Sequence, residues 1–97
     1  MYLVRDVFQT KPGKAKDLVK IFKESGKFMP KEGIGKTRVI TDVVANYWTV
    51  VLEIEIENLS VWEKMSGFTS KPEVREIMKD YMTLVEGGHR EIFKIEE

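Results

Sequence analysis

The segment Tyr47–Glu57, YWTVVLEIEIE, places an apolar residue at every second position, and this pattern constrains the fold more than any other feature. Successive side chains of a β-strand point to opposite faces, so one face of the predicted strand is entirely apolar. That face carries Trp48, Val50, Leu52, Ile54 and Ile56. The opposite face begins with Tyr47, Thr49 and Val51 and ends with three glutamates. Since a face in contact with water is normally polar along its whole length, we expect its Tyr47–Val51 portion to contact another surface.

The composition limits the classes of fold and site that are open to the chain. Its 97 residues are enough for one domain with one modest core. It has no cysteine and a single histidine, which excludes disulfides, thiolate metal sites, cysteine nucleophiles and multi-histidine metal sites. No apolar run approaches the ~18 residues of a membrane span, and the N-terminal residues lack the features of a signal peptide. We therefore expect a cytoplasmic protein with no membrane partner.

Three further segments have the residues and the flanking turn signals of strands. They are residues 2–10, 36–43 and 89–96. Pro12-Gly13 follows the first, the short turn 44–46 follows the second, and Gly87-Gly88 precedes the last.

Two helical regions separate these strands. The first follows Pro12-Gly13, has apolar residues at helical spacing, and ends near Ser25-Gly26. The second carries two apparent capping boxes, Ser60 with Glu63 and Ser70 with Glu73, and is expected to stop at Gly87-Gly88. The order βαββαβ predicts an α+β, ferredoxin-like domain over residues 1–97. Right-handed crossovers give a four-stranded antiparallel sheet in the order 4-1-3-2, with both helices on one face.

The glutamates of the central hairpin have expected partners across the strand. If the hairpin is symmetric about Ala45-Asn46, Arg38 lies opposite Glu53 and Lys36 lies opposite Glu55. Cross-strand ion pairs therefore explain the carboxylate row, and we predict no metal site there.

A sheet with both helices on one face leaves its other face uncovered. The residues expected on that face, as candidates for an interface, are Tyr47, Thr49, Val51, Ile40 and Asp42, with Arg5, Asp6 and Arg38 as charged candidates. Exposed apolar surface of this kind usually marks an interface. Stacking two such sheets around a two-fold axis would cover it, so we expect the chain to pair with itself as a homodimer.

The chain resembles the dimeric α+β barrel superfamily, which includes antibiotic-biosynthesis-monooxygenase-like and NIPSNAP-like proteins. The resemblance covers nearly the whole chain and rests on three stretches, VRDVFQTKPGKAKDLVKIFKE, YWTVVLEIEIENLSVWEKM and VEGGHREIFKIEE. It implies a homodimer whose two sheets form a shared barrel, with an internal cavity between sheet and helices. Haem-degrading members carry an Asn on the first strand and a His on a helix. Since this first strand has no Asn and His89 is expected at a strand start, the resemblance does not imply haem, and no cofactor is predicted.

The superfamily leaves the activity open, because its fold supports many functions. One hypothesis is a small dimeric barrel that binds a hydrophobic small molecule, or oxidises it as a cofactor-independent monooxygenase. The alternative is a non-enzymatic accessory or stress-related dimer with a filled core. A ligand-sensing domain is a third, less favoured hypothesis, because such members usually carry a DNA-binding segment in addition.

Candidate site residues follow from these hypotheses. A pocket for a flat apolar ligand would be lined by Trp48, Trp62, Met65, Met78 and Tyr81, although aromatic and methionine residues at this spacing are more often plain core residues. His89, or a tyrosine such as Tyr47, would have to act as the base in an oxygenase. The lysine-rich first helix is more typical of a solvated face than of a lipid or nucleic-acid contact, and we expect no nucleic-acid partner.

Overall fold

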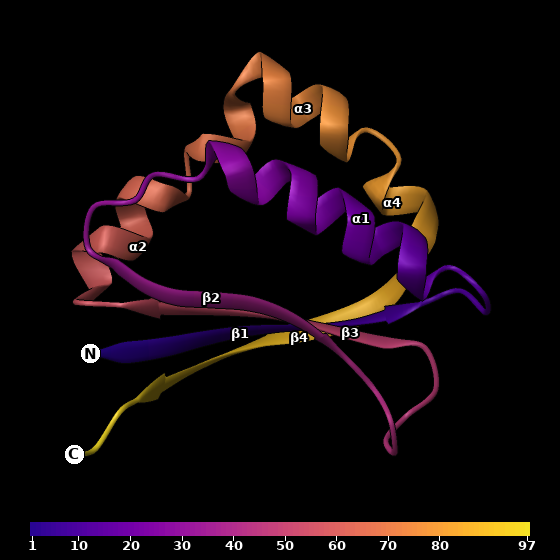
Figure 1. Cartoon of the computed structure of the whole chain (residues 1–97), viewed down its shortest axis with the longest axis horizontal. Helices are drawn as coiled ribbons and strands as arrows, with labels where there is room; N and C mark the ends of the chain where they lie inside the picture. The colour runs from indigo at the N-terminus through magenta and orange to yellow at the C-terminus, as the bar shows by residue number, and fades with distance from the viewer.

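The computed structural model describes all residues 1–97 as one sheet with helices packed on one of its faces (Figure 1). The strands are β1 (Tyr2–Thr10), β2 (Ile34–Thr41), β3 (Thr49–Ile56) and β4 (Val85–Lys94). The helices are α1 (Ala15–Ser25), α2 (Leu59–Met65), α3 (Pro72–Met78) and α4 (Tyr81–Leu84), with the short 3-10 segments η1 (Gly26–Phe28) and η2 (Phe68–Ser70). The sheet order is β2-β3-β1-β4 and every neighbouring pair is antiparallel, which confirms the predicted ferredoxin-like plan.

The β2–β3 hairpin confirms one half of the predicted register and contradicts the other. Arg38 is paired with Glu53, as expected. The expected pairing of Lys36 with Glu55 is wrong, because the register shifts between Ile34 and Thr37. Gly35 approaches Glu55 instead, so closely that a Cβ added to it would lie 3.2 Å from the Cβ of Glu55. The extra residue of this irregularity accounts for the lost pairing.

Trp48 does not lie on the apolar face of β3, so that prediction is wrong. It precedes the strand with a left-handed backbone (φ 60°) and is 42% exposed. The turn before it is held by Thr49, whose N–H donates to the carboxylate of Asp42 (2.9 Å) and whose hydroxyl donates to the carbonyl of Asn46 (2.7 Å). These bonds close the loop at Thr49, and the alternation of the strand begins only there.

The glycine pair Gly87-Gly88 lies inside β4, and the prediction that it ends a helix and precedes the strand is wrong. Gly88 is paired with Phe8 of β1, and a Cβ on it would lie 2.2 Å from the carbonyl oxygen of Val7. β4 can approach β1 this closely only where the side chain is absent. His89 is therefore a residue of the strand interior, not of its start.

The caps of the second helical region also differ from the prediction. Asn58 caps α2, because its side-chain oxygen accepts hydrogen bonds from the N–H groups of Ser60 (3.0 Å) and Val61 (3.2 Å). Ser60 lies inside the helix, so the first predicted capping box is wrong. Lys71 precedes α3 without a side-chain cap, so the second is wrong as well, although Pro72 begins that helix as expected.

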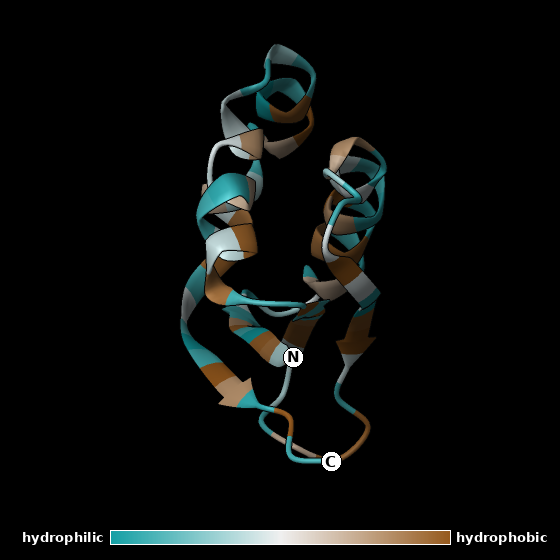
Figure 2. Ribbon diagram, turned by 90° about the vertical axis from the view of Figure 1, so that its left-hand side faces the viewer, coloured by the Kyte–Doolittle hydropathy of each residue, from teal (hydrophilic) through white to brown (hydrophobic).

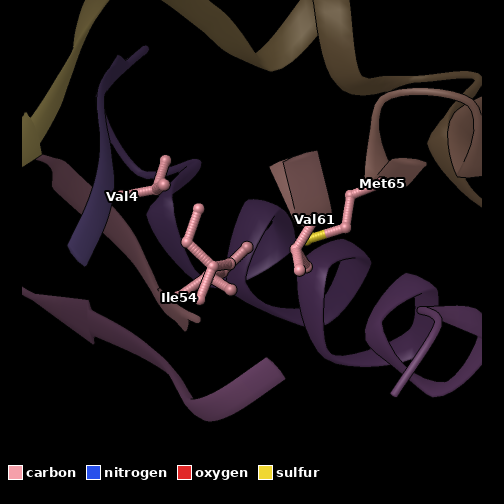
Figure 3. Close-up of a cluster of buried hydrophobic side chains, with 5 residues drawn as sticks. Val4, Ile54, Val61 and Met65 are labelled. Carbon is pink, nitrogen blue, oxygen red and sulfur yellow. The ribbon is translucent and has the colours of Figure 1, made fainter. Parts of the chain in front are cut away.

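The core consists of two clusters between the sheet and the helices. The first joins β1 and β3 to α2 and comprises Val4, Ile54, Ile56, Val61 and Met65. Figure 3 shows Val4 and Ile54 of the sheet on one side of this cluster and Val61 and Met65 of α2 on the other. The second joins β3 to α1 and α4 and comprises Leu18, Phe22, Val50 and Leu84. Leu52 packs against both. Figure 2 shows α1 and the α2–α3 segment as two rows on the same side of the sheet.

Replacing Gly88 by Ala tests whether the close approach of β4 to β1 requires glycine. The added methyl group would meet backbone atoms of β1, which cannot yield as a side chain could. We expect Gly88→Ala to lower the free energy of unfolding by about 2–3 kcal/mol, measured by urea denaturation. Gly87→Ala is the matched control, because nothing lies within 4 Å of its added Cβ. Equal stability of the two variants would contradict the assignment.

Candidate functional site

A pocket of about 800 Å³ lies between the sheet and the helices, where the two core clusters meet. All four strands contribute to its lining, together with α1, α2, α3, α4 and the two 3-10 segments. Half of its 22 lining residues are hydrophobic. This volume is in the range of pockets that enclose small organic ligands, so the structure has room for a molecule with aromatic rings.

Three aromatic side chains form one wall of the pocket. The ring centroids of Phe8 and Phe22 are 5.1 Å apart, and Tyr81 meets the ring of Phe8 edge-on at 5.7 Å. Trp62 and Met65 of α2 add further aromatic and sulfur surface to the lining. Such surfaces favour contact with another flat, apolar molecule.

An ion pair between a buried aspartate and an exposed arginine is the main polar feature of the pocket. Asp6 is 9% exposed, and its carboxylate accepts two hydrogen bonds from Arg90, at 2.5 Å from Nε and 3.3 Å from Nη2. The guanidinium of Arg90 also lies 4.6 Å from the ring centroid of Trp62, a cation–π distance. Arg90 thus connects a carboxylate to an aromatic side chain at the edge of the pocket.

The pairing of Asp6 with Arg90 was not predicted from the sequence. The prediction that Asp6 lies with Arg5 on the uncovered face of the sheet is wrong, because adjacent strand residues point to opposite faces. The apolar neighbours Val4 and Phe8, which share the face of Asp6, were the signal that could have placed it.

Tyr81 remains an uncharged hydrogen-bonding group at neutral pH. Burial raises the pKa of its phenol above the usual 10.0, and the negative charge of Asp6 raises it further, while Arg90 opposes the change. A phenol with a raised pKa can donate a hydrogen bond to a ligand but is a poor candidate for a base.

The predicted pocket residues are mostly found together. Trp62, Met65, Met78 and Tyr81 all line the pocket, whereas Trp48 does not. The two residues predicted as bases lie elsewhere. His89 is on the other face of the sheet, 60% exposed and 3.4 Å from the carboxylate of Glu91, and Tyr47 is 83% exposed in the β2–β3 loop.

The uncovered face of the sheet carries a network of four charged residues. The carboxylate of Glu53 accepts hydrogen bonds from Nε of Arg5 (2.8 Å) and Nε of Arg38 (2.6 Å), and Arg5 also donates to Glu91 (2.9 Å). Burial alone would raise the pKa of Glu53, but the hydrogen bonds and charges of the two arginines outweigh it, and the pKa lies below the usual 4.5. Two positive and two negative charges leave the network neutral at pH 7.

The residues predicted for an interface surround this network or lie near it. Val51 and Thr49 are on the uncovered face but are already buried within the single chain, with exposed fractions of 7% and 8%. Ile40, which pairs with Val51, is 38% exposed. Asp42 accepts the hydrogen bond from Thr49 and so has a local role in the hairpin. Their contact with a second chain stays a prediction.

The structure contains neither a cluster of metal-binding side chains nor a membrane-spanning helix. No three His, Cys, Asp or Glu side chains are grouped closely enough to hold a metal ion. None of the helices has the length and apolar character needed to span a lipid bilayer.

The fold is shared with solved structures of two kinds. A NIPSNAP family protein of unknown function from Agrobacterium tumefaciens has a TM-score of 0.80 at 15% identity, covering 98% of this chain and 87% of that one. A NIPSNAP-like domain protein from Burkholderia xenovorans has a TM-score of 0.81 at 14% identity, covering 99% and 85%. A protein from Nitrosomonas europaea, provisionally assigned as an antibiotic biosynthesis monooxygenase, has a TM-score of 0.77 at 9% identity, covering 100% of both chains. No protein-family model and no curated protein matches the chain. The predicted fold of the dimeric α+β barrel proteins is therefore confirmed at the level of the single chain.

Lowering the pH should weaken the fold through Glu53. Its folded-state pKa is below the unfolded value, so its contribution to stability is complete above that value and is lost as the pH falls through the folded pKa. We expect Glu53→Gln to lower the free energy of unfolding by about 2 kcal/mol at pH 7, and to flatten its dependence on pH in the acid range. Urea denaturation across this range measures both effects.

The control is Glu76→Gln, which removes the exposed ion pair with Lys79 (2.9 Å). We expect little change from it, because exposed pairs contribute little. An acid dependence that survives unchanged in Glu53→Gln would contradict the role of this carboxylate.

Proposed function

We propose that the protein binds a hydrophobic, ring-containing small molecule in the pocket between the sheet and the helices. The observation that carries the proposal is the pocket itself, about 800 Å³ and lined by the aromatic wall of Phe8, Phe22 and Tyr81. A concave site of this size, half of whose lining residues are hydrophobic, is typical of pockets that bind small organic molecules. The alternative, an accessory protein that acts only through its surface, predicts a filled core.

Binding has stronger support than oxygenation. The fold is compatible with a cofactor-independent monooxygenase, since proteins provisionally assigned to that activity share it. Such a reaction needs a base beside the substrate to take its proton. His89 is on the opposite face of the sheet, the pKa of Tyr81 is raised, and both oxygens of Asp6 accept hydrogen bonds from Arg90.

We further propose that two copies pair through the uncovered faces of their sheets. Phe93 and Ile40 are 50% and 38% exposed there. The β2–β3 loop extends away from the helices, on the side of the uncovered face (Figure 1), and its Val43 and Val44 are almost fully exposed. The charged network between these apolar residues is already paired and neutral, which lowers the cost of covering it with a second sheet.

The pocket proposal predicts saturable binding of N-phenyl-1-naphthylamine, a neutral aromatic dye whose fluorescence rises in apolar surroundings. Met78→Trp places a larger side chain in the lining and is expected to weaken this binding at least about tenfold, because the ring would occupy ligand space. Fluorescence titration measures the change.

Met82→Trp is the matched control, since Met82 is 76% exposed and does not line the pocket. It should bind the dye like the unchanged protein. Absence of saturable binding by the unchanged protein, or equal loss in both variants, would refute the pocket as the binding site.

The dimer proposal predicts that Phe93→Asp shifts the protein toward monomer at micromolar concentration. The substitution places a charge in the sheet face that the second copy would cover. Ile92→Asp is the control on the same strand, where Ile92 has a similar exposure of 43% but points to the other face of the sheet. Sedimentation equilibrium measures the mass of both. An unchanged protein that is purely monomeric would reject the pairing of the sheets.

A further inference from the structure

The mouth of the pocket is strongly basic. The lining includes five basic residues and one acidic residue, namely Lys23, Lys27, Lys31, Arg38, Arg90 and Asp6. Asp6 is bound by Arg90, and the side chain of Arg38 points to the uncovered face of the sheet, where it binds Glu53. The three lysines make no salt bridge with any carboxylate of the chain. Their charges are therefore available to a ligand.

The three lysines lie along one continuous stretch of the chain. Lys23 is in the last turn of α1, Lys27 is in η1, and Lys31 is in the segment that leads to β2 (Figure 1). Lys23 and Lys27 also border a shallow hollow on the outer side of α1, together with Lys16, Lys20 and one carboxylate, Glu24. Four lysines against one glutamate leave the hollow with a positive charge, which continues to the opening of the pocket.

This clustering is not a consequence of the overall charge of the protein. The chain has 16 basic and 16 acidic residues, so it is neutral as a whole. Like charges at one opening repel one another, and that repulsion is offset when an anion binds among them. Lysines are flexible point charges, so they suit an anionic group without imposing the bidentate geometry that arginine prefers.

We infer that the ligand of the pocket is an amphipathic anion, a small molecule with an apolar ring body and one carboxylate- or sulfonate-like group. The ring body lies against Phe8, Phe22 and Tyr81, and the anionic group lies at the mouth between Lys23, Lys27 and Lys31. This inference rests on the proposed binding function and adds the charge class of the ligand.

Two dyes with the same phenylnaphthylamine body test the inference, N-phenyl-1-naphthylamine without a charge and 1-anilinonaphthalene-8-sulfonate with one negative charge. We expect the sulfonate to bind about tenfold more tightly at low salt, the size expected for a few exposed charge pairs. This advantage should fall as sodium chloride is raised to about 0.5 M, because salt screens exposed charges. Fluorescence titrations of the full chain measure both affinities.

The variant that carries Lys23→Gln, Lys27→Gln and Lys31→Gln should lose the preference for the sulfonate and keep its affinity for the neutral dye. The control variant carries Lys11→Gln, Lys64→Gln and Lys94→Gln, three exposed lysines outside the lining, with the same change in net charge. It should keep the preference. Met78→Trp should weaken the binding of both dyes. That result would place the sulfonate in the pocket and not on the uncovered face of the sheet.

Three results would overturn the inference. Equal binding of the two dyes would do so while leaving the pocket as a binding site. Equal loss of preference in both lysine variants would attribute the effect to net charge alone. Sulfonate binding that persists in Met78→Trp would place that dye elsewhere.

A different result would refute the proposed function itself, namely that neither the neutral dye nor the sulfonate binds to the unchanged protein.

Discussion

The position of β1 between β3 and β4 is the constraint on which the rest of the structure depends. This central strand carries two adjacent charged residues, Arg5 and Asp6, and each is satisfied only by its neighbours across the strand. Arg5 binds Glu53 and Glu91 on the uncovered face, while Asp6 binds Arg90 on the helix face. A slip of one residue would exchange the two faces and leave both charges without partners.

This register separates two surfaces of different chemistry. The helix face of the sheet combines the Asp6–Arg90 pair with aromatic side chains and leaves a pocket between two core clusters. The other face combines apolar residues with a neutral network around Glu53 and has no helix over it. A ligand in the first surface and a second copy of the chain on the other would not compete for space. The proposed binding and the proposed pairing are therefore compatible.

Predictions from the sequence succeeded where a local pattern had one dominant cause. The alternation in β3, the spacing of apolar residues in α1 and the pairing of Arg38 with Glu53 were all predicted correctly. Trp62, Met65, Met78 and Tyr81 do line one pocket, but the same pattern fits an ordinary core, and their contact with a ligand stays a prediction. The failures at Trp48, Gly88 and Lys36 share a cause. In each case a contact with a neighbouring strand or loop overrides the local pattern.

The sequence by itself determined the order of the elements, the apolar face of β3 and the uncovered face of the sheet, because periodicity and the rules of chain connection act locally. Only the tertiary structure decided that Asp6 meets Arg90 and Trp62, and that His89 lies away from the pocket. Asp6 and Arg90 are 84 positions apart along the chain. Their contact depends on the exact pairing of β1 with β4, including the close approach at Gly88, which no local pattern specifies.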